Sequence, residues 1–91
     1  MRLDLGEADE LPVRVREVTD ESVVVVIDAG WAPLAFAMAQ AAIAPLAIER
    51  APAGRLNLVV RGAGADGAAV DAAVGFLEAA RSTTGQILAI S

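Results

Sequence analysis

The sequence predicts an α+β sandwich in which two helices cover one face of an antiparallel sheet. Strand-like runs come in neighbouring pairs joined by short turns, and a longer helical segment follows each pair. No internal repeat or low-complexity linker divides the 91 residues. The predicted element order is β-α-β-β-α-β with an extra N-terminal strand. Residues 1–10 are expected to be a flexible acidic arm, and residues 11–91 a single domain.

The first half of the chain is predicted to be a hairpin followed by a helix. Residues 11–18 alternate valine with arginine, which is the period of a half-buried strand. Residues 22–28 are almost wholly β-branched and suit a central strand buried on both faces. Residues 33–44 predict a helix that begins at Pro33. Because this helix is apolar almost all round, we expect the sheet to cover one side and a second subunit or second helix to cover another.

A second hairpin is predicted after Pro45, which is expected to end the first helix. Residues 46–50 are predicted to form a short strand and residues 51–54 a tight turn. Residues 55–61 then form the returning strand, because alternate positions are apolar.

The C-terminal part of the chain is predicted to be a helix and a strand. Asp66 is a suitable N-cap for a helix that runs to about Arg81. Its apolar residues recur at helical spacing, which indicates that one face packs on the sheet. Residues 86–90 are predicted to form the final strand.

Composition excludes several functions. The net charge is −5, all seven cations are arginines, and only three residues are aromatic, so no basic or base-stacking surface for nucleic acid is expected. The chain has no Cys and no His, which excludes thiol catalysis, disulfides, Cys/His zinc sites and histidine acid–base chemistry. We expect no catalytic residue, no metal site and no cofactor.

Three other features favour plain structural interpretations. The carboxylates within residues 7–10 and 20–21 lie in a predicted arm and turn, where they are solvated. Residues 62–67 read Gly-Ala-Gly-Ala-Asp-Gly, the spacing of a phosphate-cradling loop, but Asp66 would repel a pyrophosphate. A flexible connection to a capped helix is the preferred interpretation. The uncharged stretch 29–48 is interrupted by two prolines and predicts a helix buried within protein rather than across a membrane.

From Ser22 onward the sequence resembles the bacterial microcompartment shell-protein domain. Four segments carry the resemblance, in order along the chain: Ile27 to Gly30, Glu49 to Arg55, Leu56 to Gly62, and Gly85 to Leu88. The resemblance implies a non-enzymatic, cytoplasmic structural protein that assembles into a cyclic hexamer in a microcompartment shell. Its partners would be copies of itself and other shell proteins, with no nucleic acid and no membrane.

The resemblance also assigns residues to a pore and to an oligomer interface. The pore rim would consist of Arg50, Ala51, Pro52, Ala53, Gly54 and Arg55. The interface would consist of Trp31, Phe36, Gln40, Ile43 and Arg61.

Two alternatives from other classes remain open. One is a small-molecule-sensing domain that resembles the ACT domain, with Asp28, Ala29 and Gly30 as its ligand loop. The other is an adaptor module of ferredoxin-like fold with neither pore nor ligand.

Overall fold

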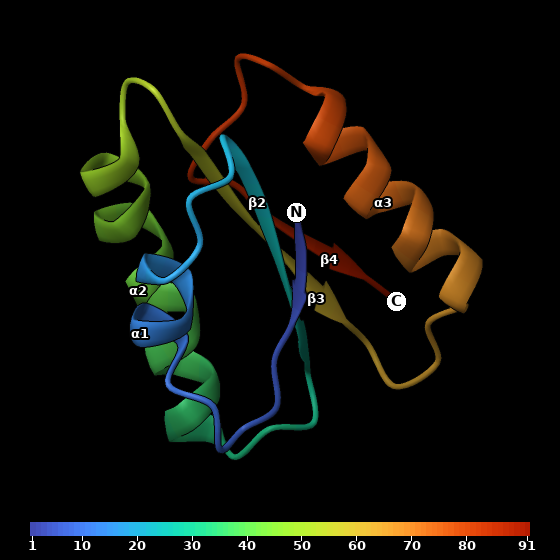
Figure 1. The fold of residues 1–91 in the computed structure, drawn as a ribbon. Coiled ribbons are helices and arrows are strands. Elements are labelled where there is room, and N and C mark those ends of the chain that lie inside the picture. Colours follow the sequence, from blue (N-terminus) through green and yellow to red (C-terminus); the bar gives the residue numbers. More distant parts are fainter.

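The computed structural model describes all residues 1–91, and its core is a four-stranded sheet with helices on both faces (Figure 1). The strands are β1 (Arg2–Asp4), β2 (Ser22–Asp28), β3 (Arg55–Arg61) and β4 (Ile87–Ile90). The helices are α1 (Leu11–Arg16), α2 (Pro33–Arg50) and α3 (Gly67–Ala79).

The sheet is parallel throughout, so the predicted antiparallel α+β sandwich is wrong. Its strand order is β1-β2-β3-β4, and each neighbouring pair is parallel. Every strand is joined to the next through a helix, as parallel pairing requires. The fold is therefore an α/β, Rossmann-like arrangement.

The predicted second hairpin fails because α2 does not end at Pro45. The helix continues to Arg50, and Leu46 and Ala47 lie on the same buried side as Ala39 and Ile43. A proline inside a helix removes one hydrogen bond and costs about 3 kcal/mol. Burial of this apolar side against the sheet offsets that cost. With residues 46–50 helical, no strand adjoins β3 in sequence, and an antiparallel hairpin cannot form.

The predicted extra strand at residues 11–18 is also wrong, because this segment forms α1. Leu11 and Val15 are buried four residues apart, whereas Val13 between them is 48% exposed. Pro12 suits the first helical turn. The alternation of valine and arginine therefore reflects one turn of a helix rather than the two faces of a strand.

The N-terminal segment joins the sheet instead of forming an arm outside the domain. Arg2–Asp4 is the edge strand β1, and Leu3 and Leu5 are buried in the core. Arg2 donates to Asp71 of α3 over 2.6 Å, which ties this edge to the helix.

The two central strands explain why helices lie on both faces rather than on one. β2 and β3 have the bounds that the sequence predicts, and five consecutive residues in each are buried. One face of these strands packs in a cluster with α1 and α2, and the other packs in a second cluster with α3. A strand that is apolar on both faces needs cover on both faces.

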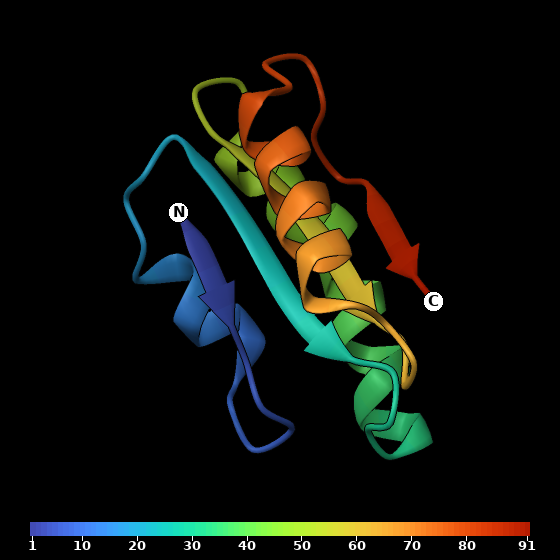
Figure 2. The same cartoon turned by 90° about the vertical axis from the view of Figure 1, so that its right-hand side faces the viewer.

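The change of face gives the last crossover an uncommon hand. Strand order advances steadily from β1 to β4, yet α3 lies on the opposite face from α1 and α2. Figure 2, with the strands pointing down and α3 in front, shows that the first two crossovers are right-handed and the third is left-handed. About 98% of such crossovers are right-handed. The return from α3 to β4 therefore needs specific contacts.

Asn57 supplies those contacts from the middle of β3. It is the one polar residue that is fully buried, and its side-chain amide donates to the carbonyl of Thr83 over 3.0 Å. Its side-chain oxygen accepts from the backbone N–H of Gln86, also over 3.0 Å. Thr84 adds a bond from the Leu56 N–H to its hydroxyl. These bonds hold residues 83–86 beside β3, so that β4 begins in register with it.

We expect Asn57→Ala to lower the free energy of unfolding by about 2–4 kcal/mol, because it leaves the Thr83 carbonyl and the Gln86 N–H without the partly buried bonds they make and opens a cavity. Equilibrium urea unfolding measures this change, and hydrogen exchange of β4 should rise more than that of β2. Ser82→Ala, in the same loop but exposed and without a side-chain hydrogen bond, should stay within about 0.5 kcal/mol. A loss below about 0.5 kcal/mol for Asn57→Ala would contradict the role given to its amide.

Candidate functional site

The carboxyl ends of β2 and β3 form the best candidate site. Asp28 and Arg61, the last residues of these strands, are direct partners in the ladder. From here the chain passes to α2 on one face and to α3 on the other. In open α/β sheets, ligands bind outside the carboxyl ends of the strands, where neighbouring connections diverge to opposite faces. β1 and β4 flank this point on either side.

A tight turn shapes the β2 side of the site. One carboxylate oxygen of Asp28 accepts from the Gly30 N–H over 2.7 Å, and the Asp28 carbonyl accepts from the Trp31 N–H over 3.3 Å. The Ala29 N–H donates to the Arg61 carbonyl over 2.9 Å, which joins the turn to β3. A Cβ on Gly30 would lie 3.0 Å from the Asp28 oxygen. The turn therefore presents an exposed carboxylate beside the half-buried Trp31.

Two charged residues complete the site from neighbouring elements. Glu7, in the loop after β1, accepts from the Ala32 N–H at the start of α2. Arg61 is half-buried and forms no ion pair, and the end of its guanidinium lies 3.8 Å from the position of a Cβ on Gly67. In a chain of net charge −5, an unpaired arginine beside the start of α3 favours an anionic group.

The three glycines after β3 do not form a phosphate cradle, although they lie between a strand and a helix of a parallel unit. A Cβ on Gly62 would be 2.8 Å from the Ile90 carbonyl oxygen, so this glycine permits close approach of β4. A Cβ on Gly64 would meet nothing within 4 Å. Asp66 caps α3 by accepting from the Ala68 N–H over 3.1 Å, as the sequence predicts. No acidic residue ends β4, where a dinucleotide fingerprint places one.

A pair of Gly→Ala variants tests this assignment. We expect Gly62→Ala to destabilise the fold by about 1–3 kcal/mol, because its methyl group would overlap the Ile90 carbonyl. Gly64→Ala should be neutral or stabilise by up to about 1 kcal/mol, because the position is open and its φ is not positive. Thermal and urea unfolding compare the two. Equal losses for both variants would contradict the assignment.

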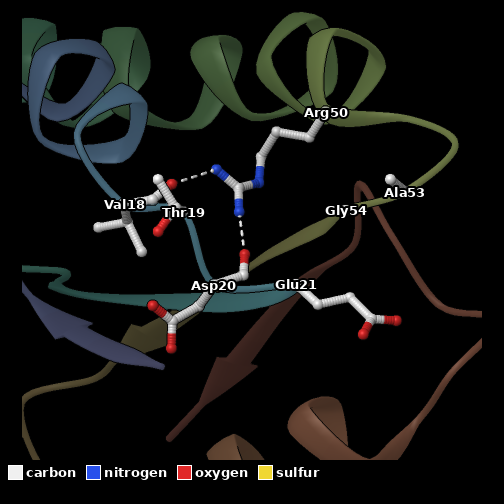
Figure 3. Close-up of a pocket in the computed structure, with 7 residues that line it drawn as sticks. All are labelled: Val18, Thr19, Asp20, Glu21, Arg50, Ala53 and Gly54. Carbon is white, nitrogen blue, oxygen red and sulfur yellow. Dashed lines mark hydrogen bonds between the residues drawn. The ribbon is translucent and has the colours of Figure 1, made fainter.

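The residues predicted as a pore rim lie at the other end of the sheet. A shallow hollow of about 540 Å³ opens there between the α1–β2 loop and the α2–β3 connection (Figure 3). Its lining residues are Val18, Thr19, Asp20, Glu21, Arg50, Ala53 and Gly54.

Arg50 points into its own chain across this hollow, as Figure 3 shows. Its guanidinium donates to the Val18 carbonyl over 3.0 Å and to the Asp20 carbonyl. Arg55 donates to Glu21 over 3.3 Å. Ala51, Pro52 and Ala53 are exposed in the connection between α2 and β3. The two arginines thus hold the α1–β2 loop against the amino ends of the strands.

An ion pair also joins α1 to the end of α2. Arg16 donates to both carboxylate oxygens of Glu49, over 3.1 and 2.7 Å. These hydrogen bonds lower the pKa of Glu49 and raise the pKa of Arg16. Both side chains are at least half exposed, so the pair positions the helices and contributes little to stability.

The residues predicted as an oligomer interface are divided among three environments. Ile43 is fully buried beneath α2. Trp31 and Phe36 are half-buried and pack against the core on the α2 side of the sheet, and Gln40 is half-buried on the same helix. Arg61 lies at the carboxyl-end site together with the predicted ligand loop, Asp28 to Gly30. That site therefore unites residues that the sequence analysis assigned to separate roles.

The chemistry available to this site is narrow. The chain has no His, Cys or Tyr, and its seven cations are all Arg, so no Lys is present. No cluster of three or more residues could hold a metal ion. Among the site residues, proton transfer could use only the carboxyls of Asp28 and Glu7, and Glu7 is already bonded to the Ala32 N–H.

The fold and this site define a Rossmann-like α/β protein with its candidate site at the carboxyl edge of a parallel sheet. The model of a family described as SDR-like, short chain dehydrogenase-like protein, matches residues 7–90. The chain therefore belongs to this SDR-like family. No curated protein and no solved structure gives a match.

This assignment corrects the functional predictions. Membership of the microcompartment shell family, with its hexamer and pore, is wrong, because the matching family is dehydrogenase-like. The prediction of a non-enzymatic structural protein is wrong for the same reason, and neither the ACT-like nor the ferredoxin-like alternative is supported. No helix has both the length and the apolar character needed to cross a membrane. A location in a microcompartment shell has no support.

Sequence reasoning missed Glu7, which it treated as a solvated carboxylate. It also did not join Arg61 to the Asp28 turn. One available signal could have joined Arg61 to the Asp28 turn. A strand expected to be buried on both faces implies helices on both faces, hence a parallel sheet whose carboxyl ends share one edge.

Proposed function

We propose that this chain contributes to a nicotinamide-dependent oxidoreductase, with the reacting end of the cofactor bound at the carboxyl ends of β2 and β3. The observation that carries the proposal is the match of a dehydrogenase-like family over residues 7–90. The divergence of α2 and α3 at this edge gives the place for a ligand. Oxidoreductases of this chemistry transfer a hydride between the nicotinamide ring and a carbonyl or alcohol carbon.

The residues at the site fit one part of such a cofactor and not another. The unpaired guanidinium of Arg61 suits a phosphate oxygen, and Trp31, which follows the Asp28 turn on the α2 side of the sheet, offers an apolar ring. The pyrophosphate of a dinucleotide needs a glycine cradle at a helix N-terminus. Gly62, Gly64 and Gly67 do not provide one, because only Gly62 requires the absence of a Cβ, and its neighbour there is β4. We therefore assign to this chain the nicotinamide side of the cofactor alone.

Asp28 is the candidate for moving the proton that accompanies hydride transfer. One of its oxygens holds Gly30, and the other has no hydrogen bond within the chain. Asp28→Asn keeps an oxygen that accepts from the Gly30 N–H, but it replaces the ionisable carboxyl with an amide that does not act as an acid or a base. The variant therefore removes proton transfer by this residue without removing the hydrogen bond that shapes the turn.

The single tryptophan makes binding directly measurable. We expect reduced nicotinamide mononucleotide to quench Trp31 emission and to receive energy from it, with an affinity close to that of NADH. Arg61→Ala should weaken binding about tenfold or more, since a hydrogen bond to a charged group contributes about 1.5–3 kcal/mol. Arg81→Ala, which removes an exposed arginine just after the C-terminal end of α3, is the matched control and should change nothing.

Two results would overturn the proposal. One is the absence of quenching by NADH, NADPH and the mononucleotide alike at millimolar concentration. The other is binding that Arg61→Ala and Arg81→Ala weaken equally, because the affinity would then reflect net charge rather than the site at β2 and β3.

A further inference from the structure

The two carboxylates at the candidate site have different hydrogen-bond partners. Asp28 accepts from the N–H of Gly30 within its own turn, and its other oxygen forms no hydrogen bond within the chain. Glu7 accepts from the N–H of Ala32, at the far end of the same turn, from a position 25 residues away in the sequence. One carboxylate therefore belongs to the turn, and the other holds the turn from outside.

The far end of the turn depends on Glu7 because α2 has no cap of its own. Ala32 is the N-cap residue of this helix and has no side-chain oxygen, and Pro33, which follows it, has no N–H. The Glu7 carboxylate takes the place of the missing cap. It also lies at the positive end of the helix dipole, where a negative charge is favoured.

The near end of the turn is held by the sheet. The Ala29 N–H donates to the Arg61 carbonyl of β3 over 2.9 Å. Between the two ends, the Trp31 N–H makes only a long bond of 3.3 Å to the Asp28 carbonyl. Trp31 therefore lies between one end that β3 fixes and another that Glu7 fixes.

Glu7 is itself held by the loop that carries it. One carboxylate oxygen of Asp9 accepts from the Gly6 N–H over 2.7 Å, and the Asp9 N–H donates to the Gly6 carbonyl over 3.0 Å. The other oxygen of Asp9 accepts from Arg14 of α1 over 3.0 Å. The loop is thus closed around Glu7 and joined to α1, so Glu7 extends from a fixed backbone.

We propose that Glu7 is the positioning residue of this site, holding the turn of residues 28–32 through the Ala32 N–H while Asp28 keeps one oxygen for a ligand. In the ligand that it positions, this role rests on the proposed function, whereas the state of the turn is measurable in the free chain. A displacement of about 1 Å in a group that orients a ligand can cost about a hundredfold in rate. An exposed hydrogen bond can therefore matter more to the site than to the stability of the fold.

Trp31 emission and amide exchange test the positioning in the free chain. Glu7→Ala should shift Trp31 emission to longer wavelength and increase its quenching by acrylamide, because the far end of the turn loses its anchor. Exchange of the Gly30 and Ala32 amide protons should rise, whereas exchange in β2 and β3 should not. Glu7→Gln keeps an oxygen that can accept from Ala32 and should restore the wild-type values. Glu10→Ala, exposed in the same loop and without a side-chain hydrogen bond, is the matched control and should change neither measurement.

Binding of reduced nicotinamide mononucleotide tests the consequence for the site. Glu7→Ala should weaken this binding about tenfold, and Glu7→Gln should bind as the wild-type chain does. Asp9→Ala should act in the same direction, because it frees the loop that carries Glu7. The double variant Glu7→Ala/Asp9→Ala should bind no more weakly than Glu7→Ala alone, because both changes act through one hydrogen bond.

The two experiments have separate outcomes. A wild-type chain that does not bind the mononucleotide overturns the proposed function, and the emission and exchange of the free chain still decide the role of Glu7. Equal emission and exchange in Glu7→Ala and Glu10→Ala overturn the positioning role. A Glu7→Gln variant that behaves like Glu7→Ala also overturns it, because net charge rather than the hydrogen bond to Ala32 would then be responsible.

Discussion

The amide of Asn57 is the interaction on which the rest of this sheet depends. A left-handed return from α3 to β4 is the least favoured connection in the fold, and the strand pairing of β4 begins only at Ile87. Just before it, the Gly85 N–H donates to the Leu56 carbonyl over 2.7 Å, and the Leu58 N–H donates to the Gln86 carbonyl over 2.9 Å. The side chain of the fully buried Asn57 adds a bond to the Thr83 carbonyl and one from the Gln86 N–H, and these side-chain bonds favour the observed register of β4. A buried polar group that is fully paired specifies geometry in a way that an apolar residue cannot.

The register of β4 in turn shapes the candidate site. β4 ends beside Gly62, whose N–H donates to the Ile90 carbonyl over 2.7 Å, and the connection from β3 to α3 leaves the sheet there toward the face opposite α2. The β2 turn, held by the Asp28 carboxylate, leaves toward the other face. The two connections therefore diverge at Asp28 and Arg61, and Gly62 serves the packing of β4 rather than ligand binding.

Much of the local structure was predictable from the sequence, and the topology was not. The β-branched run defines β2 and the alternating apolar positions define β3, each with the observed bounds, and Asp66 marks the start of α3, because these signals are strong within a few residues. Pro45 misled the prediction because burial against the sheet overrides a proline. The segment 11–18 misled it because so short an alternation of valine and arginine fits both the period of a strand and that of a helix. Treating 11–18 and 46–50 as strands made two hairpins, and these two errors turned a parallel sheet into an antiparallel one. At the site, Asp28 to Gly30 and Arg61 were singled out, but only the parallel topology brings them together.

The apolar residues of α2 lie on two sides of the helix, and the fold explains only one of them. Its inner side must fill the space over β2 and β3, whose residues on that side are themselves fully buried, and this requires Ile43 and Leu46. Its outer side faces no element of the chain, so nothing in the fold requires Leu34, Met38 or Ile48 to be apolar. Exposed apolar side chains lower solubility and contribute nothing to the stability of a monomer. The apolar character of the outer side of α2 therefore does not follow from the packing of this chain, whereas that of the inner side does.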